Sequence, residues 1–232
     1  MINRIKFLIS QQARFNLFLS FFLTYFKYKI SKKKNQLNND NWKNFIKKKK
    51  ITIDWFSFKS FFFYLILKDK KNFSYLEIGS FEGNSLLYIL ENYKTANVVA
   101  VDTWQGSDEH QETSDEFSKF ENNFDDNLKN YKHRFKKIKS TSENFFLNNK
   151  QCFDIVYIDG SHDYNDVKTD LKNSWKFLNL EGIIICDDYF FSYYENKKRL
   201  PARAINEFIY DNKDTCEVIY LTKFQIFLKK VK

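Results

Sequence analysis

The sequence predicts an α/β fold: a mostly parallel, seven-stranded sheet covered by helices, preceded by a helical extension. Two observations support this. From residue 73 onward, short apolar runs alternate with longer amphipathic ones, as in a parallel sheet with helices on both faces. The last two apolar runs are separated only by Thr222, Lys223 and Phe224, which is too short for a crossover helix. We therefore expect the sheet to end in an antiparallel hairpin.

The individual elements follow from the same pattern. Apolar runs predict strands at residues 75–78, 97–101, 136–139, 154–158, 183–186, 217–221 and 225–228. Amphipathic runs predict helices at residues 84–92, 115–132, 142–148, 164–178 and 202–211. Upstream, the aromatic-rich segment 54–68 predicts a buried helix, and the polar, lysine-rich segment 31–50 predicts a solvated connector.

Length and composition set the outer limits. The 232 residues, 43% of them hydrophobic, support one α/β domain with a modest addition, so we expect a basic extension at residues 1–50 and the main domain at 51–232. The three cysteines, Cys152, Cys186 and Cys216, are odd in number and lack metal-type spacing. This disfavours a disulfide framework or a zinc cluster and fits a reducing cytoplasm. Cys152 and Cys186 lie in or beside apolar runs and are expected to be buried.

Charge is distributed unevenly. The net charge is +9, but residues 1–72 carry 17 Lys and Arg against 3 Asp and Glu, whereas residues 73–232 carry 21 against 26. A slightly acidic main domain argues against a nucleic-acid groove around the active site, so no nucleic-acid partner is expected.

The basic front end contains an uncharged run, FNLFLSFFLTYF, between Arg14 and Lys27. As a helix its twelve residues cover about 18 Å, short of the roughly 30 Å core of a bilayer, so it should not span a membrane. A narrow polar stripe recurs at helical spacing, formed by Asn16, Ser20, Thr24 and Lys27. Such a helix needs a partner surface. Its own domain, a second copy of the chain in a homo-oligomer, or the anionic inner face of a membrane all remain open.

Chemistry is expected at the carboxyl ends of the parallel strands. The first strand runs into a turn with Gly79 and Gly83, which lets the backbone approach a ligand closely. Phe81 stands two residues after Gly79, so the turn is not a dinucleotide fingerprint and a nicotinamide cofactor is disfavoured. The second strand ends at Asp102, whose carboxylate can accept both hydroxyls of a ribose.

These residues carry a resemblance. Glu77-x-Gly79-x-x-x-Gly83-x-Ser85 with Asp102 resembles the cofactor motifs of class I S-adenosylmethionine-dependent methyltransferases, with the spacing of the catechol O-methyltransferase-like branch. The segments AVDTWQGSDEH (100–110), DIVYIDGSHDYNDVKTDL (154–171) and IIICDDY (183–189) are similar to a bacterial family that includes sugar O-methyltransferases. The resemblance covers roughly residues 73–230. It implies a Rossmann-like three-layer sandwich that binds S-adenosylmethionine.

The resemblance also implies roles for single residues. Gly79 and Gly83 would pass beside the methionine portion of the cofactor, Glu77 would shape that pocket, and Asp102 would hold the ribose. Ser140 or Ser142 would flank the adenine. Trp104 either stacks on the adenine or belongs to the core, and His110 lies either on the surface or against the substrate. The remaining expected cofactor contacts are Ser80, Ser85, Thr103 and Asp159.

Carboxylates also follow the fourth and fifth strands. Asp159, Asp187 and Asp188 would converge at the mouth of the sheet, and hard oxygen ligands of this kind favour Mg²⁺ or another divalent cation. In the metal-dependent O-methyltransferases that the chain resembles, the matching positions are acidic or amide ligands, and Asp188 replaces an amide found in some relatives. A metal-free pocket, with Asp159 merely capping the next helix, is the alternative.

His162 follows Asp159 by three residues. An ordinary imidazole pKa of about 6.5 suits a general base for a substrate hydroxyl. The predicted activity is therefore methyl transfer to a hydroxyl of a small molecule, with a sugar or glycan precursor as the preferred acceptor. The alternatives are a metal-independent methyltransferase, a non-catalytic membrane-associated scaffold and, least favoured, a nicotinamide-dependent oxidoreductase.

Overall fold

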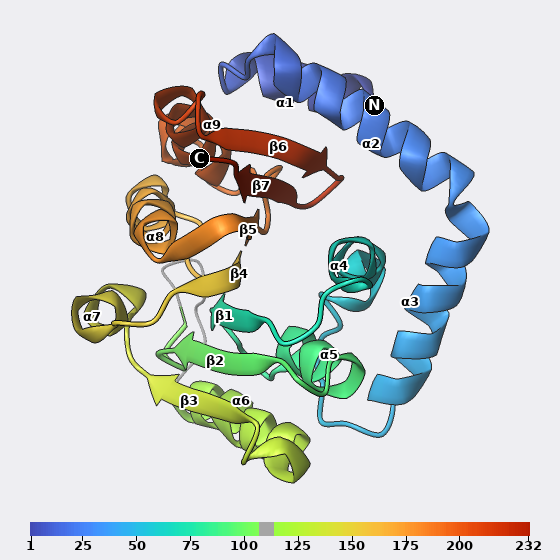
Figure 1. Cartoon of the computed structure of the whole chain (residues 1–232), viewed down its shortest axis with the longest axis vertical. Coiled ribbons are helices and arrows are strands. Elements are labelled where there is room, and N and C mark those ends of the chain that lie inside the picture. Colours follow the sequence, from blue (N-terminus) through green and yellow to red (C-terminus); the bar gives the residue numbers. More distant parts are fainter. Residues whose placement is uncertain (107–113) are drawn as a thin grey trace.

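The computed structural model, which describes residues 1–106 and 114–232, has a seven-stranded sheet flanked by helices (Figure 1). The strand order is β3-β2-β1-β4-β5-β7-β6. The strands are β1 (Ser74–Ile78), β2 (Asn97–Asp102), β3 (Phe135–Lys139), β4 (Phe153–Ile158), β5 (Leu178–Cys186), β6 (Cys216–Leu221) and β7 (Ile226–Lys230). Strands β1 to β5 are paired in parallel, and β7 runs antiparallel between β5 and β6. The predicted parallel sheet and terminal hairpin are both confirmed.

Helices cover both faces and make the fold a three-layer sandwich. One face carries α4 (Ser60–Leu67), α5 (Asn84–Asn92) and α6 (Ser114–Leu128), and the other carries α7 (Ser142–Asn148), α8 (Tyr164–Lys176) and α9 (Pro201–Asp211). Alternating strand residues feed the two cores: Leu76 and Ile78 belong to one, while Tyr75 belongs to the other. Among the strands, the expected boundaries differ most at β5, which begins at Leu178 rather than at residue 183.

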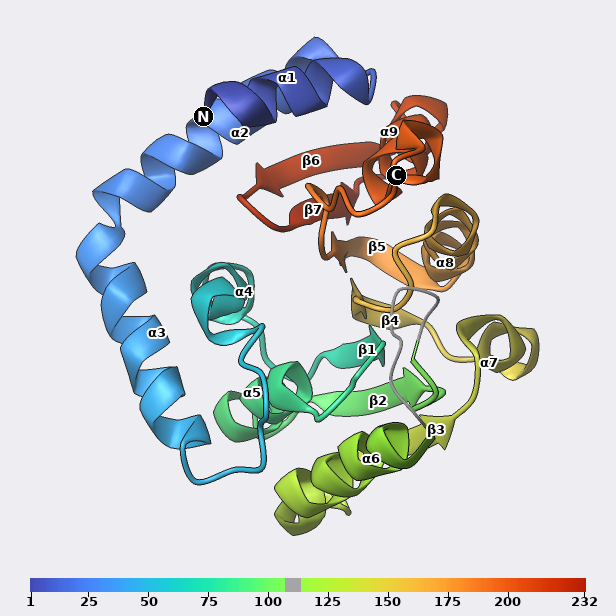
Figure 2. The same cartoon turned by 180° about the vertical axis from the view of Figure 1, so that it is seen from behind.

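The front end forms three helices, α1 (Ile2–Ser10), α2 (Phe15–Ile30) and α3 (Lys32–Ile46), that curve around one side of the sandwich (Figures 1 and 2). The polar stripe of α2 faces edge strand β6. Ser20 Oγ donates to the Val218 carbonyl at 3.2 Å, and the Leu221 amide donates to Thr24 Oγ1 at 3.1 Å. Among the described residues, none of the helices combines the length and apolarity needed to cross a bilayer.

The expectation of a solvated connector at residues 31–50 is wrong. Helix α3 occupies most of this segment because a few of its residues meet surfaces that only the folded chain provides. Trp42 is buried, donates from its indole nitrogen to Asn84 Oδ1 at 2.9 Å, and packs edge-on against Tyr88. Asn38 donates to Ser60 Oγ at 2.7 Å. Tertiary contacts with α4 and α5 therefore outweigh a weak local pattern.

The burial of the cysteines differs from the expectation at one position. Cys186 and Cys216 are buried, whereas Cys152, which precedes β4 in a loop, is exposed. The prediction is confirmed for Cys186 and wrong for Cys152, because proximity to an apolar run in sequence does not place a loop residue inside the core.

Candidate active site

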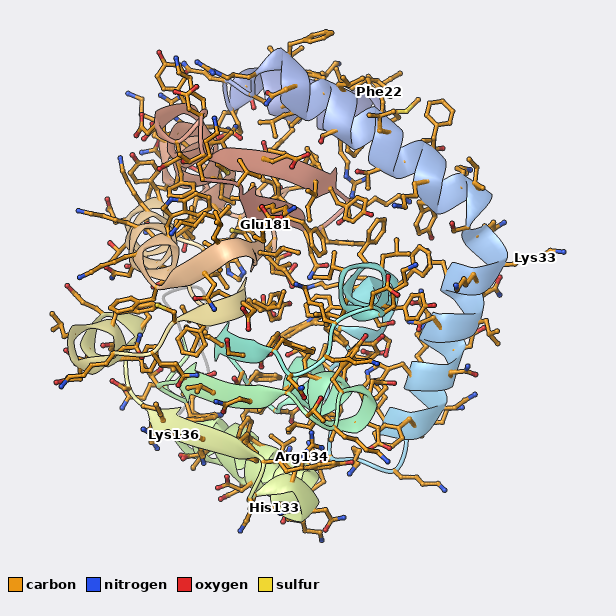
Figure 3. The ribbon with its side chains drawn as sticks, in the orientation of Figure 1. Phe22, Lys33, His133, Arg134, Lys136 and Glu181 are labelled. Atoms are coloured by element: carbon orange, nitrogen blue, oxygen red, sulfur yellow. The ribbon has the colours of Figure 1, made fainter. Side chains whose placement is uncertain are left out.

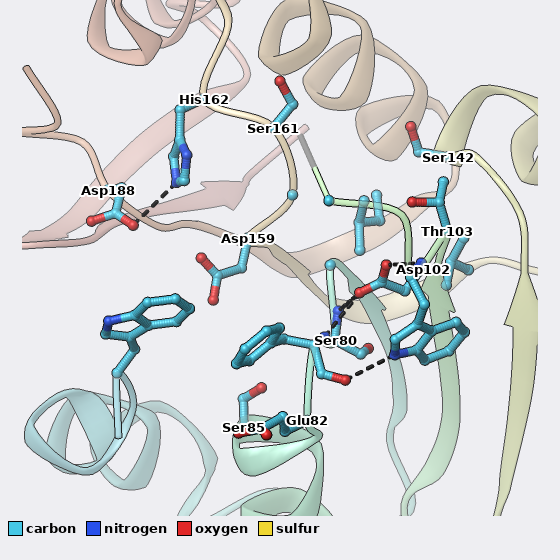
Figure 4. Close-up of a pocket in the computed structure, with 18 of the residues that line it drawn as sticks. Ser80, Glu82, Ser85, Asp102, Thr103, Ser142, Asp159, Ser161, His162 and Asp188 are labelled. Atoms are coloured by element: carbon cyan, nitrogen blue, oxygen red, sulfur yellow. Dashed lines mark hydrogen bonds and ion pairs between the residues drawn. The ribbon is translucent and has the colours of Figure 1, made fainter. Parts of the chain in front are cut away.

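A cavity of about 870 Å³ opens at the carboxyl ends of β1, β2, β4 and β5 (Figure 4). Most of the predicted site residues line it: Gly79, Ser80, Ser85, Asp102, Thr103, Trp104, Ser142, Asp159, His162 and Asp188. Ser140 lines it as well. Glu77, Gly83 and Asp187 are not among its lining residues, and His110 lies outside the described residues. Thus the separate loops named from the sequence meet around one crevice.

Gly79 brings two strand ends together. Its φ of +83° is left-handed, and a Cβ there would lie 2.2 Å from the Asp159 carbonyl oxygen. Only glycine permits this contact without moving the backbone. Gly83, with a φ of +81°, lies at the start of α5 against Phe124. The turn between them presents its backbone to the cavity.

Asp102 is held rigidly at the rim. One carboxylate oxygen accepts from the backbone amides of Ser80 and Phe81 at 2.7 and 2.9 Å, and the other accepts from the Trp104 amide at 2.7 Å. A carboxylate has about four lone-pair positions. Three amide donors therefore fix its orientation and leave acceptor capacity for a ligand hydroxyl.

Trp104 belongs mainly to the core. Its side chain is 5% exposed, its indole nitrogen donates to the Phe81 carbonyl at 2.8 Å, and its ring packs edge-on against Phe124. Ser142 points its hydroxyl to Asp170, at 2.5 Å. Burial raises the pKa of Asp170 to about 7 even though the Ser142 hydrogen bond opposes the shift.

Glu77 lies beneath the glycine turn. It is fully buried and accepts from the Tyr75 hydroxyl at 2.8 Å. Burial raises its pKa to about 8, against the lowering effect of the hydrogen bond from Tyr75. It can therefore support the turn from below, although it does not line the cavity itself.

The acidic end of the cavity joins Asp159, His162 and Asp188. One ligand atom from each lies within 4.8 Å of the others, and His162 Nε2 is 3.2 Å from Asp188 Oδ2. The imidazole stacks on the Phe191 ring, with centroids 4.3 Å apart. Figure 4 shows Asp159 between this pair and the Asp102 side of the cavity.

Asp187 does not join this group. It forms an ion pair with Lys59, and both side chains are almost fully buried. The Tyr157 hydroxyl also contacts Asp187, and it lies 2.7 Å from Asp159 Oδ2. Neighbouring residues at a strand end project to different sides. The structure therefore places His162, rather than Asp187, beside Asp159 and Asp188.

Burial and neighbouring charges together shift the pKa values of Asp159 and Lys59. Burial, then the nearby Asp187, raise the pKa of Asp159 well above its usual range, while the Lys59 ammonium opposes the shift. Burial alone would lower the pKa of Lys59, but the carboxylates, Asp187 foremost, raise it above its ordinary value. Lys59 therefore stays charged and acts as a built-in counter-ion at the cavity wall.

Sequence reasoning missed several cavity residues, among them Lys59, Glu82 and Asp170. Glu82 is buried and accepts from the Thr52 amide at 2.7 Å and from Asn123 Nδ2 at 2.7 Å. It thereby ties the segment before α4 and helix α6 to the glycine turn. Glu82 lies between Gly79 and Gly83, so its place in the turn motif could have indicated that it belongs to the site. The sequence around Lys59 gives no such indication.

The geometry agrees with comparisons to known proteins. A family model matches the chain from β1 to the residue after Asp188. Residues 76–189 match a methyltransferase domain. This methyltransferase domain contains Asp102, Asp159 and His162.

Similar proteins support the fold. An uncharacterised protein of Acanthamoeba polyphaga mimivirus is 32% identical over 126 residues, 52% of this chain and 53% of that protein, so the chain spans about half the length of this curated relative. A Podospora anserina methyltransferase, solved with S-adenosylhomocysteine bound, is 19% identical (TM-score 0.56, covering 83% and 86% of the two chains). A Corynebacterium glutamicum protein is 13% identical (TM-score 0.58; 90% and 98%). The O-methyltransferase NovP is 14% identical (TM-score 0.51; 72% and 75%).

Proposed function

We propose that this chain transfers the methyl group of S-adenosylmethionine to a hydroxyl oxygen of a small molecule. The observation that carries the proposal is the arrangement of one cavity: the Gly79 turn and Asp102 form one end, and Asp159, His162 and Asp188 form the other (Figure 4). A donor site and an acceptor site within one enclosed space are what methyl transfer requires.

The donor end suits an adenosyl group. Asp102 is oriented by three backbone amides and keeps acceptor capacity for ribose hydroxyls. Gly79 itself puts no side chain into the cavity, so the backbone there can approach the methionine portion closely. Ser142 lines the same cavity and would flank the adenine.

The acceptor end can remove a proton. A neutral His162 that donates from Nε2 to Asp188 has Nδ1 as its acceptor nitrogen, and a carboxylate partner stabilises the imidazolium once the proton arrives. The acceptor oxygen attacks the methyl carbon as the carbon–sulfur bond breaks. The bonding electron pair stays on sulfur, S-adenosylhomocysteine is released, and the hydroxyl proton passes to His162.

A divalent cation fits the same residues. Asp159, His162 and Asp188 supply two carboxylates and one imidazole at ligand spacing. Carboxylates suit Mg²⁺ and Mn²⁺, while an imidazole shifts the preference toward Mn²⁺ and other transition ions. Bound there, the cation would lower the pKa of the acceptor hydroxyl. As its ligand, His162 could not also accept the proton through the same nitrogen.

A metal-independent reaction is the second candidate. One observation favours it: the Lys59 ammonium already offsets the charge of Asp187 and acts electrostatically on Asp159 and Asp188. The carboxylates at this end therefore have a resident counter-charge. The His162–Asp188 pair could then act as general base without a metal.

The acceptor class we propose is a sugar or glycan precursor. The similarity of three segments to sugar O-methyltransferases supports this. The cavity wall also offers aromatic faces, from Trp55, Phe81, Phe120, Phe191 and Phe224. A cavity of about 870 Å³ lies within the range of sites that hold drug-sized ligands.

Calorimetric titration with S-adenosylhomocysteine and, separately, NAD tests the donor assignment. We expect micromolar binding of the former alone; binding of NAD alone would replace the methyltransferase with an oxidoreductase. Transfer of labelled methyl groups to a panel of sugars, phenols and amines then tests the acceptor, with and without chelator. Loss of transfer on chelation, restored by Mn²⁺ or Mg²⁺, supports the metal site; undiminished transfer supports the metal-independent reaction. Donor binding without transfer to any acceptor would favour a scaffold.

A further inference from the structure

Helix α2 turns an apolar stripe outward. Five large residues follow one another at intervals of three or four and therefore lie on one helix face. Their exposed fractions are 82% for Phe15, 51% for Leu19, 61% for Leu23, 60% for Phe26 and 87% for Ile30. Figures 1 and 2 place α2 on the outside of the molecule, beyond β6. We call these five residues the α2 outer face.

The orientation of α2 is fixed by its opposite face. Leu17 and Phe21 are buried in the core, and Ser20 and Thr24 are bonded to the backbone of β6. Lys27 Nζ lies 2.5 Å from the Tyr220 hydroxyl. Turning the apolar stripe inward would break all of these contacts. The exposed stripe is thus a consequence of how the helix docks, and water is a poor environment for it.

The N-terminal segment that carries the α2 outer face has charges of one sign. Residues 1–39 contain no Asp or Glu, but they do contain Arg4, Lys6, Arg14, Lys27, Lys29, Lys32, Lys33 and Lys34. The last three begin α3, directly after the apolar stripe, and are exposed. Figure 3 shows Lys33 pointing away from the body of the molecule.

We propose that the α2 outer face docks on a lipid bilayer containing anionic headgroups. An apolar helix face flanked by lysines is suited to lie in the plane of the interface, with the apolar side chains in the acyl boundary and the ammonium groups among the phosphates. At about 1.5 Å per residue, the 16 residues of α2 extend about 24 Å along that plane. A second copy fits the face less well, because pairing two such faces would bring together segments that carry only positive charge.

Vesicle flotation of the full chain tests the proposal. The probes are vesicles of phosphatidylcholine alone and vesicles with about 30% phosphatidylglycerol, a proportion chosen to give a strongly anionic surface. We expect binding to the anionic vesicles, little binding to the neutral ones, and at least about tenfold weaker binding at 0.5 M salt, where charge attraction is screened. Absence of binding to anionic vesicles at low salt would overturn the proposal.

Two sets of variants locate the surface. Leu19→Ser, Leu23→Ser and Phe26→Ser together should lower vesicle binding at least about tenfold, because each removes apolar area from the bilayer. The matched control is Leu147→Ser with Leu180→Ser, since both leucines are exposed (77% and 63%) outside residues 1–39. Lys32→Gln, Lys33→Gln and Lys34→Gln should remove most of the preference for anionic lipid. Lys197→Gln with Lys198→Gln is the control, because it removes positive charge outside residues 1–39 and should leave the lipid preference unchanged.

The same variants separate a second copy from a membrane. Sedimentation equilibrium should show no association that depends on the α2 outer face. A dimer abolished by the three serine substitutions, together with unchanged vesicle binding of that variant, would assign the face to self-association. Thermal unfolding checks that each variant folds. Vesicle binding is measured without substrate. The membrane proposal can therefore fail while the proposed methyl transfer stands, and methyl transfer can fail while vesicle binding stands.

Discussion

Lys59 and Asp187 form an ion pair that is almost completely removed from solvent, at the wall of the candidate active site. Their exposed side-chain fractions are 4% and 1%, although the residues lie 128 positions apart in the chain. Tyr157 links this pair to Asp159 and hence to the acidic end of the cavity. The state of one buried lysine is thereby connected to the site where the acceptor is expected.

The first prediction concerns that ion pair. Lys59→Met should reduce the free energy of unfolding by about 3–5 kcal/mol, because it leaves a buried carboxylate without its counter-charge. Urea denaturation measures the change. Lys68→Met is the matched control, since Lys68 pairs with Asp69 at the surface, where exposed fractions of 45% and 86% imply an effect below about 1 kcal/mol. Similar losses in the two variants would contradict the role assigned to Lys59.

The second prediction concerns the proton acceptor. His162→Ala should lower methyl transfer by about 10²–10⁴-fold, the usual contribution of a general base, while S-adenosylhomocysteine binding stays within a few-fold of wild type. Calorimetry and a labelled-methyl assay provide the two measurements. His133→Ala removes an exposed imidazole outside the cavity and should alter neither. Full activity of His162→Ala would eliminate this residue as the base.

The third prediction distinguishes the carboxylates that bind a metal ion from those that only line the cavity. Asp159→Ala and Asp188→Ala should each weaken Mn²⁺ binding by at least about tenfold, as expected when one of three ligands is lost. Asp166→Ala is the control, because Asp166 lines the same cavity but lies outside the ligand group. Titration calorimetry with Mn²⁺ measures the affinities. If His162→Ala also weakens Mn²⁺ binding, the imidazole is a ligand; equal affinities in all variants would exclude the site.

The fourth prediction concerns the glycine turn. Gly79→Ala should destabilise the fold by at least about 2–4 kcal/mol, because alanine resists a φ of +83° and its Cβ would collide with the Asp159 carbonyl. Gly160→Ala serves as the control: the nearest atom to its Cβ is 3.6 Å away, an ordinary contact. Melting temperatures report both effects. A Gly79→Ala protein as stable as Gly160→Ala would show that the turn relaxes easily.

The fifth prediction is a pH dependence. The pKa of Asp170 is about 7 in the folded chain against an ordinary 3.8. Between these values the unfolded chain has lost this proton while the folded chain keeps it, so stability should fall as pH rises from about 4 to 7. The slope from one such group is at most about 1.4 kcal/mol per pH unit. Below pH 4 and above pH 7 its contribution is constant.

Asp170→Asn removes this titration. Denaturation of the variant should show a flatter pH profile between pH 4 and 7, and greater stability than wild type at pH 8. Asp211→Asn, which changes an exposed carboxylate of α9 that does not act on Asp170, should leave the wild-type slope in place. Parallel profiles for Asp170→Asn and wild type would show that Asp170 does not govern this part of the curve.

The sequence predicts the sheet and most of the strand-end residues that it assigns to the site because both depend on local rules. Strands and their ends can be located from apolar periodicity, and parallel strands end at a common edge, so Asp102 and Asp159 were expected to share one crevice. The orientation of Asp187 depends on its ion pair with Lys59. The sequence around Lys59 contains no pattern that would assign this lysine to the site. Helix α3 was missed for a similar reason, since Trp42 finds its partners only once α4 and α5 are in place.

The two outermost strands show different ways to keep a sheet from growing. At one end, β3 carries Lys136, Lys137 and Lys139, and such charges discourage another strand from adding. At the other end, β6 has Ser20 and Thr24 of α2 bonded to its backbone. Helix α2 thus occupies hydrogen-bonding groups that would otherwise recruit a foreign strand, and it protects the protein against edge-to-edge aggregation.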